Sequence, residues 1–154
     1  MKALEKEAID YHRSIMLNAS LDSVFEALTE RIDTWWSTIE GVASKEGDVF
    51  KVSFGPGSYW KFKVLELRKN ESITWVCLLS HQDHHLQGMD QEWLNTKLHW
   101  NLENQDLGVK LDFLHEGLDS SGVCFEVCST AWDFYLFDSL KSLLETGVGK
   151  PAGT

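Results

Sequence analysis

The chain has 154 residues, of which 43% are hydrophobic and 12% aromatic, so it is too apolar to be disordered and long enough for one well-packed domain. Its 24 acidic and 14 basic residues give a formal net charge of -10, which disfavours nucleic acids and anionic membrane surfaces as partners. The start, MKALEKEAID, lacks an apolar signal region, and the longest apolar run, Trp75 to Leu79, is too short to cross a bilayer. Three cysteines suit a reducing compartment better than a disulfide framework. We therefore expect a single domain over residues 1–154, located in the cytoplasm.

The first quarter of the chain predicts a strand and two short helices. Ile9 to Leu17 places apolar residues on one parity, interrupted by Arg13, as expected of a half-exposed strand. In ASLDSVFEALT, Ser20 can cap a helix whose apolar residues recur at helical spacing. The same spacing recurs before Gly41 and predicts a second short helix with Ile32, Trp35, Trp36 and Ile39 on one face.

From Gly47 onward the apolar period changes to two, which predicts a run of about five strands. The turns fall at GPGS, Lys69-Asn70-Glu71 and NQDLG, and the polar stretch SHQDHHLQGMDQE forms a longer loop. The residues expected to face inward are Phe50, Val52, Phe54, Trp60, Phe62, Val64, Ile73, Trp75, Cys77, Leu79, Leu98, Trp100, Leu102, Leu111, Phe113 and His115.

The last segment, roughly Phe125 to Thr146, predicts one long helix that ends at Gly147. Its broad apolar face comprises Cys128, Trp132, Tyr135, Leu136, Leu140, Leu143 and Leu144. An antiparallel sheet with a single long helix must bury its apolar face against that helix, and a curved sheet leaves a cavity beneath it. We therefore expect an α+β helix-grip fold, in which a curved antiparallel sheet wraps around the C-terminal helix.

Several separated motifs resemble one known family. EWLNTKLHWNLE and GVKLDFLHEGL match paired late strands that commonly contain E-W-x-G-T and H-x-G-(L/F), while CFEVCSTAWDFYLFDSLKSLLETGVGKP matches a final helix. VFEALT and the paired tryptophans also fit, and Asn95 stands where the family often has glycine. The chain thus resembles SRPBCC (START/Bet v 1-like) proteins of the group named for the activator of heat shock protein 90 ATPase.

This resemblance implies a helix-grip fold with a cavity more than it implies an activity. The superfamily includes lipid and polyketide-ligand carriers, aromatase/cyclases, hormone receptors and co-chaperone domains. The implied binding site lies between the sheet and the C-terminal helix.

Two groups of residues could suggest a metal. Cys124 and Cys128 lie four positions apart, but a tetrahedral zinc site needs two further ligands, so we favour a packing role for both. The loop HQDHH offers His81, His84 and His85, yet a solvated loop or a lid over the cavity is the simpler interpretation. We expect neither a metal nor a cofactor.

His115 is the strongest candidate for chemistry, because it should point inward toward the helix. Most inward histidines are satisfied core groups, and the alternatives are contact with a ligand or acid/base catalysis with Ser129, Tyr135, Cys77 or Cys128 as polar partners. Convergent tryptophans on the sheet and helix predict an apolar pocket. The predicted ligand-binding residues are Trp36, Trp75, Cys77, Leu98, Trp100, Phe113, His115, Cys128, Trp132, Tyr135 and Leu136.

Three functions remain open, in this order. The first is a binding protein that holds a hydrophobic or aromatic small molecule, and the second is a cyclase- or hydrolase-type enzyme in which His115 transfers a proton. The third is a co-chaperone-like domain whose acidic surface meets a protein partner. Exposed apolar strand or loop surface would also allow a homodimer. We expect a binding protein rather than an enzyme.

Overall fold

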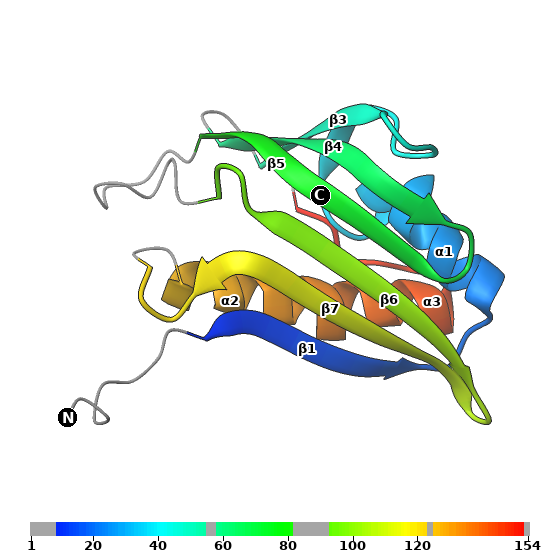
Figure 1. Ribbon diagram of the computed structural model, residues 1–154. Helices are drawn as coiled ribbons and strands as arrows, with labels where there is room; N and C mark the ends of the chain where they lie inside the picture. Colours follow the sequence, from blue (N-terminus) through cyan, green and yellow to red (C-terminus); the bar gives the residue numbers. More distant parts are fainter. Residues whose placement is uncertain (1–8, 55–57, 82–92, 123–124, 153–154) are drawn as a thin grey trace.

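One antiparallel sheet curves around a long C-terminal helix, as Figure 1 shows for this computed structural model, which describes residues 9–54, 58–81, 93–122 and 125–152. Within those residues the sheet has seven strands in the order β1-β7-β6-β5-β4-β3-β2. The strands are β1 (Asp10–Leu17), β2 (Thr38–Gly41), β3 (Val49–Ser53), β4 (Tyr59–Arg68), β5 (Ser72–His81), β6 (Lys97–Gln105) and β7 (Gly108–Asp119). The predicted α+β helix-grip fold is confirmed.

The prediction of the first helix is confirmed, and the prediction of the second helix is wrong. Helix α1 (Leu21–Thr29) begins at Ser20, whose hydroxyl accepts a hydrogen bond from the Ser23 backbone amide. The expected second helix is reduced to one 3₁₀ turn, η2 (Ile32–Thr34). Ile39 lies instead in β2, opposite Val52 of β3. Pairing with the sheet edge satisfies the backbone of this segment, and this outweighs an apolar spacing that also fits a helix.

The C-terminal helix is continuous but changes its winding. It comprises α2 (Phe125–Asp133), the π-helical segment η4 (Phe134–Leu140) and α3 (Lys141–Thr146), and Gly147 caps it with a left-handed backbone (φ 91°). Its face toward the sheet buries Cys128, Trp132, Leu136, Ser139, Leu140 and Leu143. No helix in the described part of the chain is long and apolar enough to cross a membrane.

The predicted inward parity holds for most strand residues, but it is wrong for Leu79. The pairing of β4 with β5 places Lys61 opposite Leu79 and Phe62 opposite Cys77, so Leu78 is an extra residue in β5. A bulge of this kind shifts the parity of the strand beyond it. Leu79 therefore faces outward and is 48% exposed.

Aromatic side chains fill the space between the sheet and the helix. All seven tryptophans are buried: Trp35, Trp36, Trp60, Trp75, Trp93, Trp100 and Trp132. Trp36 lies between two others, with ring centroids 4.9 Å from Trp132 and 6.2 Å from Trp75. Trp35 and Trp36 thus belong to the central core.

Candidate functional site

An apolar pocket of about 200 Å³ lies between the sheet and the first turns of the C-terminal helix. Six aromatic residues line it together with Ser58, Val127, Cys128 and Ala131; the aromatic ones are Trp36, Phe54, Trp60, Trp93, Trp132 and Tyr135. None of the described Asp, Glu, Lys, Arg or His residues contributes to this lining. The pocket is partly open to solvent, and its surface suits an uncharged, flat, apolar molecule.

The inner wall at Trp36 is positioned by segments from both ends of the chain. The neighbouring Trp35 donates from its indole Nε1 to the carbonyl oxygen of Ala27 in α1 at 2.7 Å. Ser139 in η4 donates to the Trp35 carbonyl oxygen at 2.6 Å, and the Ala152 amide donates to the Trp36 carbonyl oxygen at 2.9 Å. These bonds fix the backbone of the Trp35–Trp36 pair, so that the Trp36 ring has a defined place in the pocket wall.

The floor at Trp132 is held by a buried chain of hydrogen bonds. Trp132 Nε1 donates to His115 Nδ1 at 3.1 Å, and His115 Nε2 lies 2.9 Å from Thr96 Oγ1. Thr96 Oγ1 in turn donates to the Trp93 carbonyl oxygen at 2.6 Å. Since an indole only donates and Thr96 already gives its proton to a carbonyl, we assign His115 as the neutral tautomer with the proton on Nε2.

This environment keeps His115 uncharged. Its side chain is 0% exposed, and burial, with a smaller contribution from His99, lowers its pKa from 6.5 to about 3. The Trp93 ring packs edge-on against the imidazole at 4.5 Å between centroids. Both ring nitrogens therefore have protein partners, and the imidazole orients Trp132 from behind the pocket wall.

The polar partners expected for His115 lie elsewhere. Ser129 donates to the Glu126 carbonyl oxygen of its own helix at 3.3 Å, and the Cys77 thiol donates to the Leu79 carbonyl oxygen at 3.2 Å. Burial raises the pKa of Cys77 to about 12, so its thiol stays protonated at neutral pH. Burial also raises the pKa of Tyr135, whose ring lines the pocket.

The structure divides the predicted ligand-binding residues into two sets. Those lining the pocket are Trp36, Cys128, Trp132 and Tyr135. Those packed in the core behind it are Trp75, Cys77, Leu98, Trp100, Phe113, His115 and Leu136. The lining residues that the sequence analysis did not select are Phe54, Ser58, Trp60, Trp93, Val127 and Ala131. Phe54, Ser58 and Trp60 lie at or next to the ends of β3 and β4, and Val127 and Ala131 lie one helical turn apart on α2.

The metal hypotheses concern residues that are only partly described. Within the described ranges, no three His, Cys, Asp or Glu side chains gather into a metal-binding group. Cys124, His84 and His85 lie outside those ranges, so their predicted roles stay predictions. Cys128 contributes to the pocket, and its sulfur accepts a hydrogen bond from Trp93 Nε1 at 3.3 Å.

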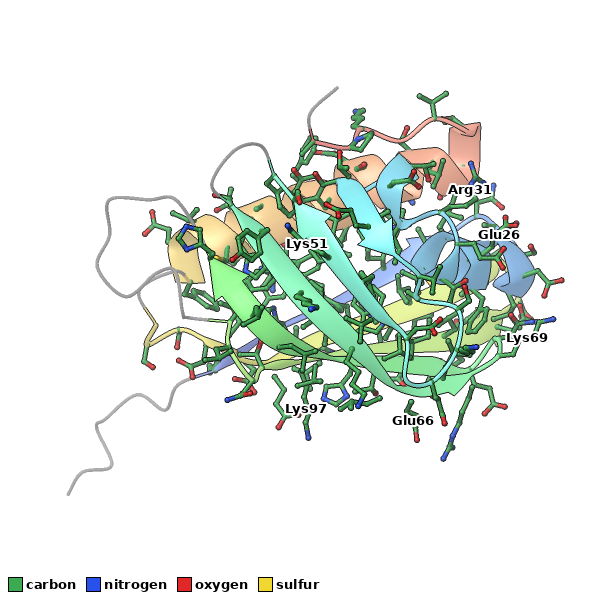
Figure 2. All side chains as sticks on the ribbon, turned by 90° about the horizontal axis from the view of Figure 1, so that it is seen from above. Glu26, Arg31, Lys51, Glu66, Lys69 and Lys97 are labelled. Carbon is green, nitrogen blue, oxygen red and sulfur yellow. The ribbon has the colours of Figure 1, made fainter. Side chains whose placement is uncertain are left out.

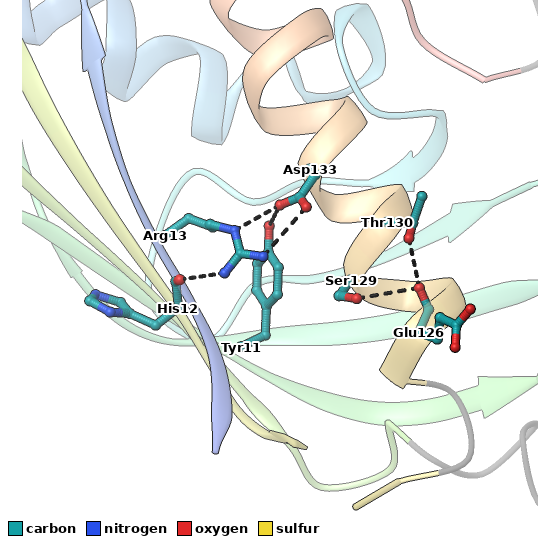
Figure 3. A network of polar contacts seen from close by, with 7 residues as sticks. All are labelled: Tyr11, His12, Arg13, Glu126, Ser129, Thr130 and Asp133. Carbon is teal, nitrogen blue, oxygen red and sulfur yellow. Dashed lines mark hydrogen bonds and ion pairs between the residues drawn. The ribbon is translucent and has the colours of Figure 1, made fainter. Parts of the chain in front are cut away.

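A second polar cluster anchors the helix to the edge strand β1, as Figure 3 shows. Asp133 accepts from the Tyr11 hydroxyl at 2.6 Å and from Arg13 Nε at 2.8 Å. The Arg13 guanidinium also lies over the Tyr11 ring, 4.4 Å from its centroid. Burial and Asp133 together raise the pKa of Tyr11. The arginine that interrupts the apolar parity of β1 is thus the partner of a helix carboxylate.

Comparison with known proteins identifies the family. The model of the family described as "Activator of Hsp90 ATPase homolog 1-like protein" matches residues 18–145. The chain belongs to this family. No curated protein matches the chain in sequence.

Solved structures agree with this assignment. The Aha1 dimer from Colwellia psychrerythraea is 27% identical, with a TM-score of 0.73 over 92% of this chain and 99% of that one. Protein MLL2253 from Mesorhizobium loti is 17% identical, with a TM-score of 0.74 over 89% of this chain and 97% of that one. DynU16, described as a putative protein in the dynemicin biosynthetic locus, is 18% identical, with a TM-score of 0.69 over 90% of this chain and 48% of that one. The latter two likenesses concern the fold alone.

The family-like motifs now have a physical explanation. Asn95 adopts a left-handed backbone (φ 67°), which glycine accepts freely and asparagine better than most other residues. Gly117 (φ 103°) has no Cβ, and a Cβ there would lie 2.7 Å from Thr96 Cγ2. The two strand motifs therefore bring Trp93, Thr96 and His115 together in one buried unit.

Proposed function

We propose that this protein binds a small, uncharged aromatic or hydrophobic molecule in the pocket between the sheet and the C-terminal helix. The observation that carries the proposal is a lining of six aromatic side chains, to which no charged residue in the described part of the chain contributes. Apolar burial would supply the affinity, at roughly 25 cal/mol per Å² of surface removed from water. Aromatic stacking against Trp36, Trp60 or Trp93 would orient a flat ring.

The size of the pocket narrows the ligand class. Typical sites for drug-sized ligands measure about 300–1,000 Å³, whereas an engineered cavity of about 150 Å³ in another protein holds benzene. A pocket of about 200 Å³ therefore suits one ring, a small fused ring system or the end of a longer apolar chain. Trp60 Nε1 has no hydrogen-bond partner among the described residues, so an acceptor on the ligand could satisfy this buried donor.

Binding rather than catalysis is the function that the geometry favours. An acid or base must reach the reacting atoms through a free nitrogen or oxygen. Both nitrogens of His115 are bonded to Trp132 and Thr96, and His115 does not line the pocket. An enzymatic use of His115 would first require one of these bonds to break.

A matched pair of helix variants tests the proposal. Ala131→Trp would fill the pocket from an exposed position. Thr130→Leu adds apolar volume at the preceding residue, which does not line the pocket. A library of single-ring and fused-ring compounds is screened by tryptophan fluorescence and thermal shift. At a ligand concentration about one hundred times Kd, binding adds about 2.7 kcal/mol, which corresponds to a rise in Tm of roughly 5 °C or more. We expect Ala131→Trp to lose this response and Thr130→Leu to keep it.

Two results would overturn the proposal. One is the absence of any hit while a crystal structure shows the pocket closed by its own side chains. The other is a hit whose affinity is the same in Ala131→Trp as in the unmodified protein, because that ligand must bind elsewhere.

We further propose that the chain forms a homodimer. The Colwellia relative is described as a dimer, and here Phe134, Phe137 and Val127 expose 39–42% of their surface on the helix. Light scattering after size exclusion should give twice the chain mass, and Phe134→Ser with Phe137→Ser should restore the monomer. A monomer at all concentrations would reject this assembly.

A further inference from the structure

The outer face of the sheet carries a strip of lysines that the pocket does not involve. Four of them lie across β3, β4 and β6: Lys51, Lys61, Lys63 and Lys97. The register connects them, because Lys51 lies opposite Lys61, Lys63 opposite Val76, and Val76 opposite Lys97. Figure 2 looks down on β3 and β4, with the long helix behind them and Lys51 labelled over these strands.

These lysines have no acidic partner among the described residues. None of the four is within salt-bridge distance of a described carboxylate, although ion pairs form at several other places. Glu40 lies opposite Lys51 without reaching it, and Glu116, opposite Lys97, is bonded to His99 at 2.8 Å. The Nζ of Lys51 lies over a ring, 4.7 Å from the Tyr59 centroid.

The arrangement is unfavourable for the isolated chain. Like charges directly opposite each other on neighbouring strands destabilise a sheet, yet Lys51 faces Lys61 here. The whole chain has a net charge of -10, so a local concentration of positive charge is the exception on its surface. Across β2, β3 and β4 the unpaired lysines Lys51, Lys61 and Lys63 outnumber the one groove carboxylate, Glu40. Unpaired charges mainly of one sign are the pattern expected where a partner of the opposite sign binds.

A groove accompanies the charges. It measures about 410 Å³, and its walls combine Lys51, Lys61 and Glu40 with the apolar parts of Val49, Tyr59 and Leu79. Leu79 is present there only because the bulge at Leu78 turns it outward, where it is 48% exposed. Basic and apolar groups therefore alternate across a short distance on the outer face.

We propose that this groove and lysine strip dock an extended acidic segment of a partner protein. In an extended chain, alternate side chains point the same way and repeat every ~6.6 Å, while adjacent strands lie about 4.8 Å apart. Carboxylates on every second residue can thus reach lysines on neighbouring and next-neighbouring strands. Apolar residues between them would contact Leu79 and Val49.

Other occupants fit this face less well. A two-fold dimer through the strip would place lysines against lysines, which is repulsive. A nucleic acid or an anionic membrane would meet an acidic molecule around a strip of only a few positive charges. A short acidic peptide would contact only the lysine strip and groove, and not the acidic surface around them.

The test uses a fluorescent peptide that alternates glutamate with leucine, and a control peptide in which glutamine replaces glutamate. Anisotropy measures binding to the unmodified protein and to two triple variants with equal net charge. One is Lys51→Gln, Lys61→Gln and Lys63→Gln in the strip, and the other is Lys45→Gln, Lys69→Gln and Lys150→Gln outside it. We expect the strip variant to weaken binding by about tenfold or more and the outside variant by about twofold or less. The strip variant should also melt at an equal or higher temperature, because it removes the repulsion between Lys51 and Lys61.

Several outcomes would overturn the proposal. Equal weakening in both triple variants would mean that only net charge matters, and equal binding of the glutamine peptide would mean that charge does not. Absence of binding to the glutamate peptide would reject the site. If duplex DNA or phosphatidylserine vesicles bind through the same lysines and the peptide does not, the partner class is wrong. Self-association abolished only in the strip variant would identify a second copy as the occupant.

Discussion

Thr96→Val isolates the buried hydrogen-bond chain that holds the pocket floor. Valine keeps nearly the same shape but removes Oγ1, which lies 2.9 Å from His115 Nε2 and donates to the Trp93 carbonyl oxygen at 2.6 Å. The carbonyl oxygen keeps the Thr96 backbone amide at 3.0 Å, whereas His115 is 0% exposed and gains no water in exchange. A stranded buried N–H costs about 1–3 kcal/mol, so we expect the free energy of unfolding to fall by about 2 kcal/mol.

Urea denaturation measures this loss, and Thr74→Val provides a matched control. Thr74 Oγ1 lies 3.3 Å from His99 Nδ1 on the outer face, where both residues are partly exposed and water can replace the lost hydroxyl. The control should cost less than about 0.5 kcal/mol. Equal losses in the two variants, or a loss below about 0.5 kcal/mol for Thr96→Val, would refute the assigned chain. Nitrogen chemical shifts of His115 test the same tautomer directly.

Three further predictions concern His115 and two residues close to its partner Thr96, namely Gly117 and Asn95. Because the pKa of folded His115 is about 3 and that of an ordinary histidine 6.5, the unfolded chain binds more protons between these values, and stability should fall as pH decreases through this window. The slope should be smaller in His115→Gln by up to about 1.4 kcal/mol per pH unit, and identical urea-derived slopes would contradict the assignment. Gly117→Ala places a Cβ 2.7 Å from Thr96 Cγ2 in a residue with a positive φ. We expect it to lower the free energy of unfolding by more than about 2 kcal/mol, and an unchanged value from urea denaturation would be inconsistent with this contact. Asn95→Ala should cost about 1 kcal/mol while Asn95→Gly is neutral or stabilising, and the reverse order of melting temperatures would reject the left-handed conformation.

Sequence patterns predicted the local structure correctly where one interaction dominates it. The cap at Ser20 and the two-residue period of β6 and β7 correctly predicted a helix and an inward His115. They failed at Ile39, because its apolar spacing fits a helix and a strand equally, and only pairing with β3 decides between them. They also failed at Leu79, because no local signal predicted the bulge at Leu78.

The pocket was predicted only in part, since its walls meet through tertiary contacts. Trp36, Cys128, Trp132 and Tyr135 were selected from helical or aromatic patterns and do line it. The partners of His115 could not be derived from spacing, because Thr96 and Trp132 lie 19 and 17 positions away and on different elements. The packing of α2 against the sheet decides which side chains line the pocket. This packing depends on the whole core and not on any local sequence pattern.

In the proposed function, Trp132 would determine how deep a ligand can enter. A curved sheet around a helix predicts a large internal cavity, but here the Trp132 ring fills its centre, 4.6 Å from Phe113 and 4.9 Å from Trp36 between centroids. Trp132 also lines the pocket of about 200 Å³. Because Trp132 is held by the bond from its Nε1 to His115 Nδ1, a larger ligand would have to break that bond and leave a buried acceptor unpaired. If the pocket binds a ligand as proposed, the neutral His115 would limit that ligand to ring-sized molecules without touching it. An inward histidine would then matter for binding although it does not line the site.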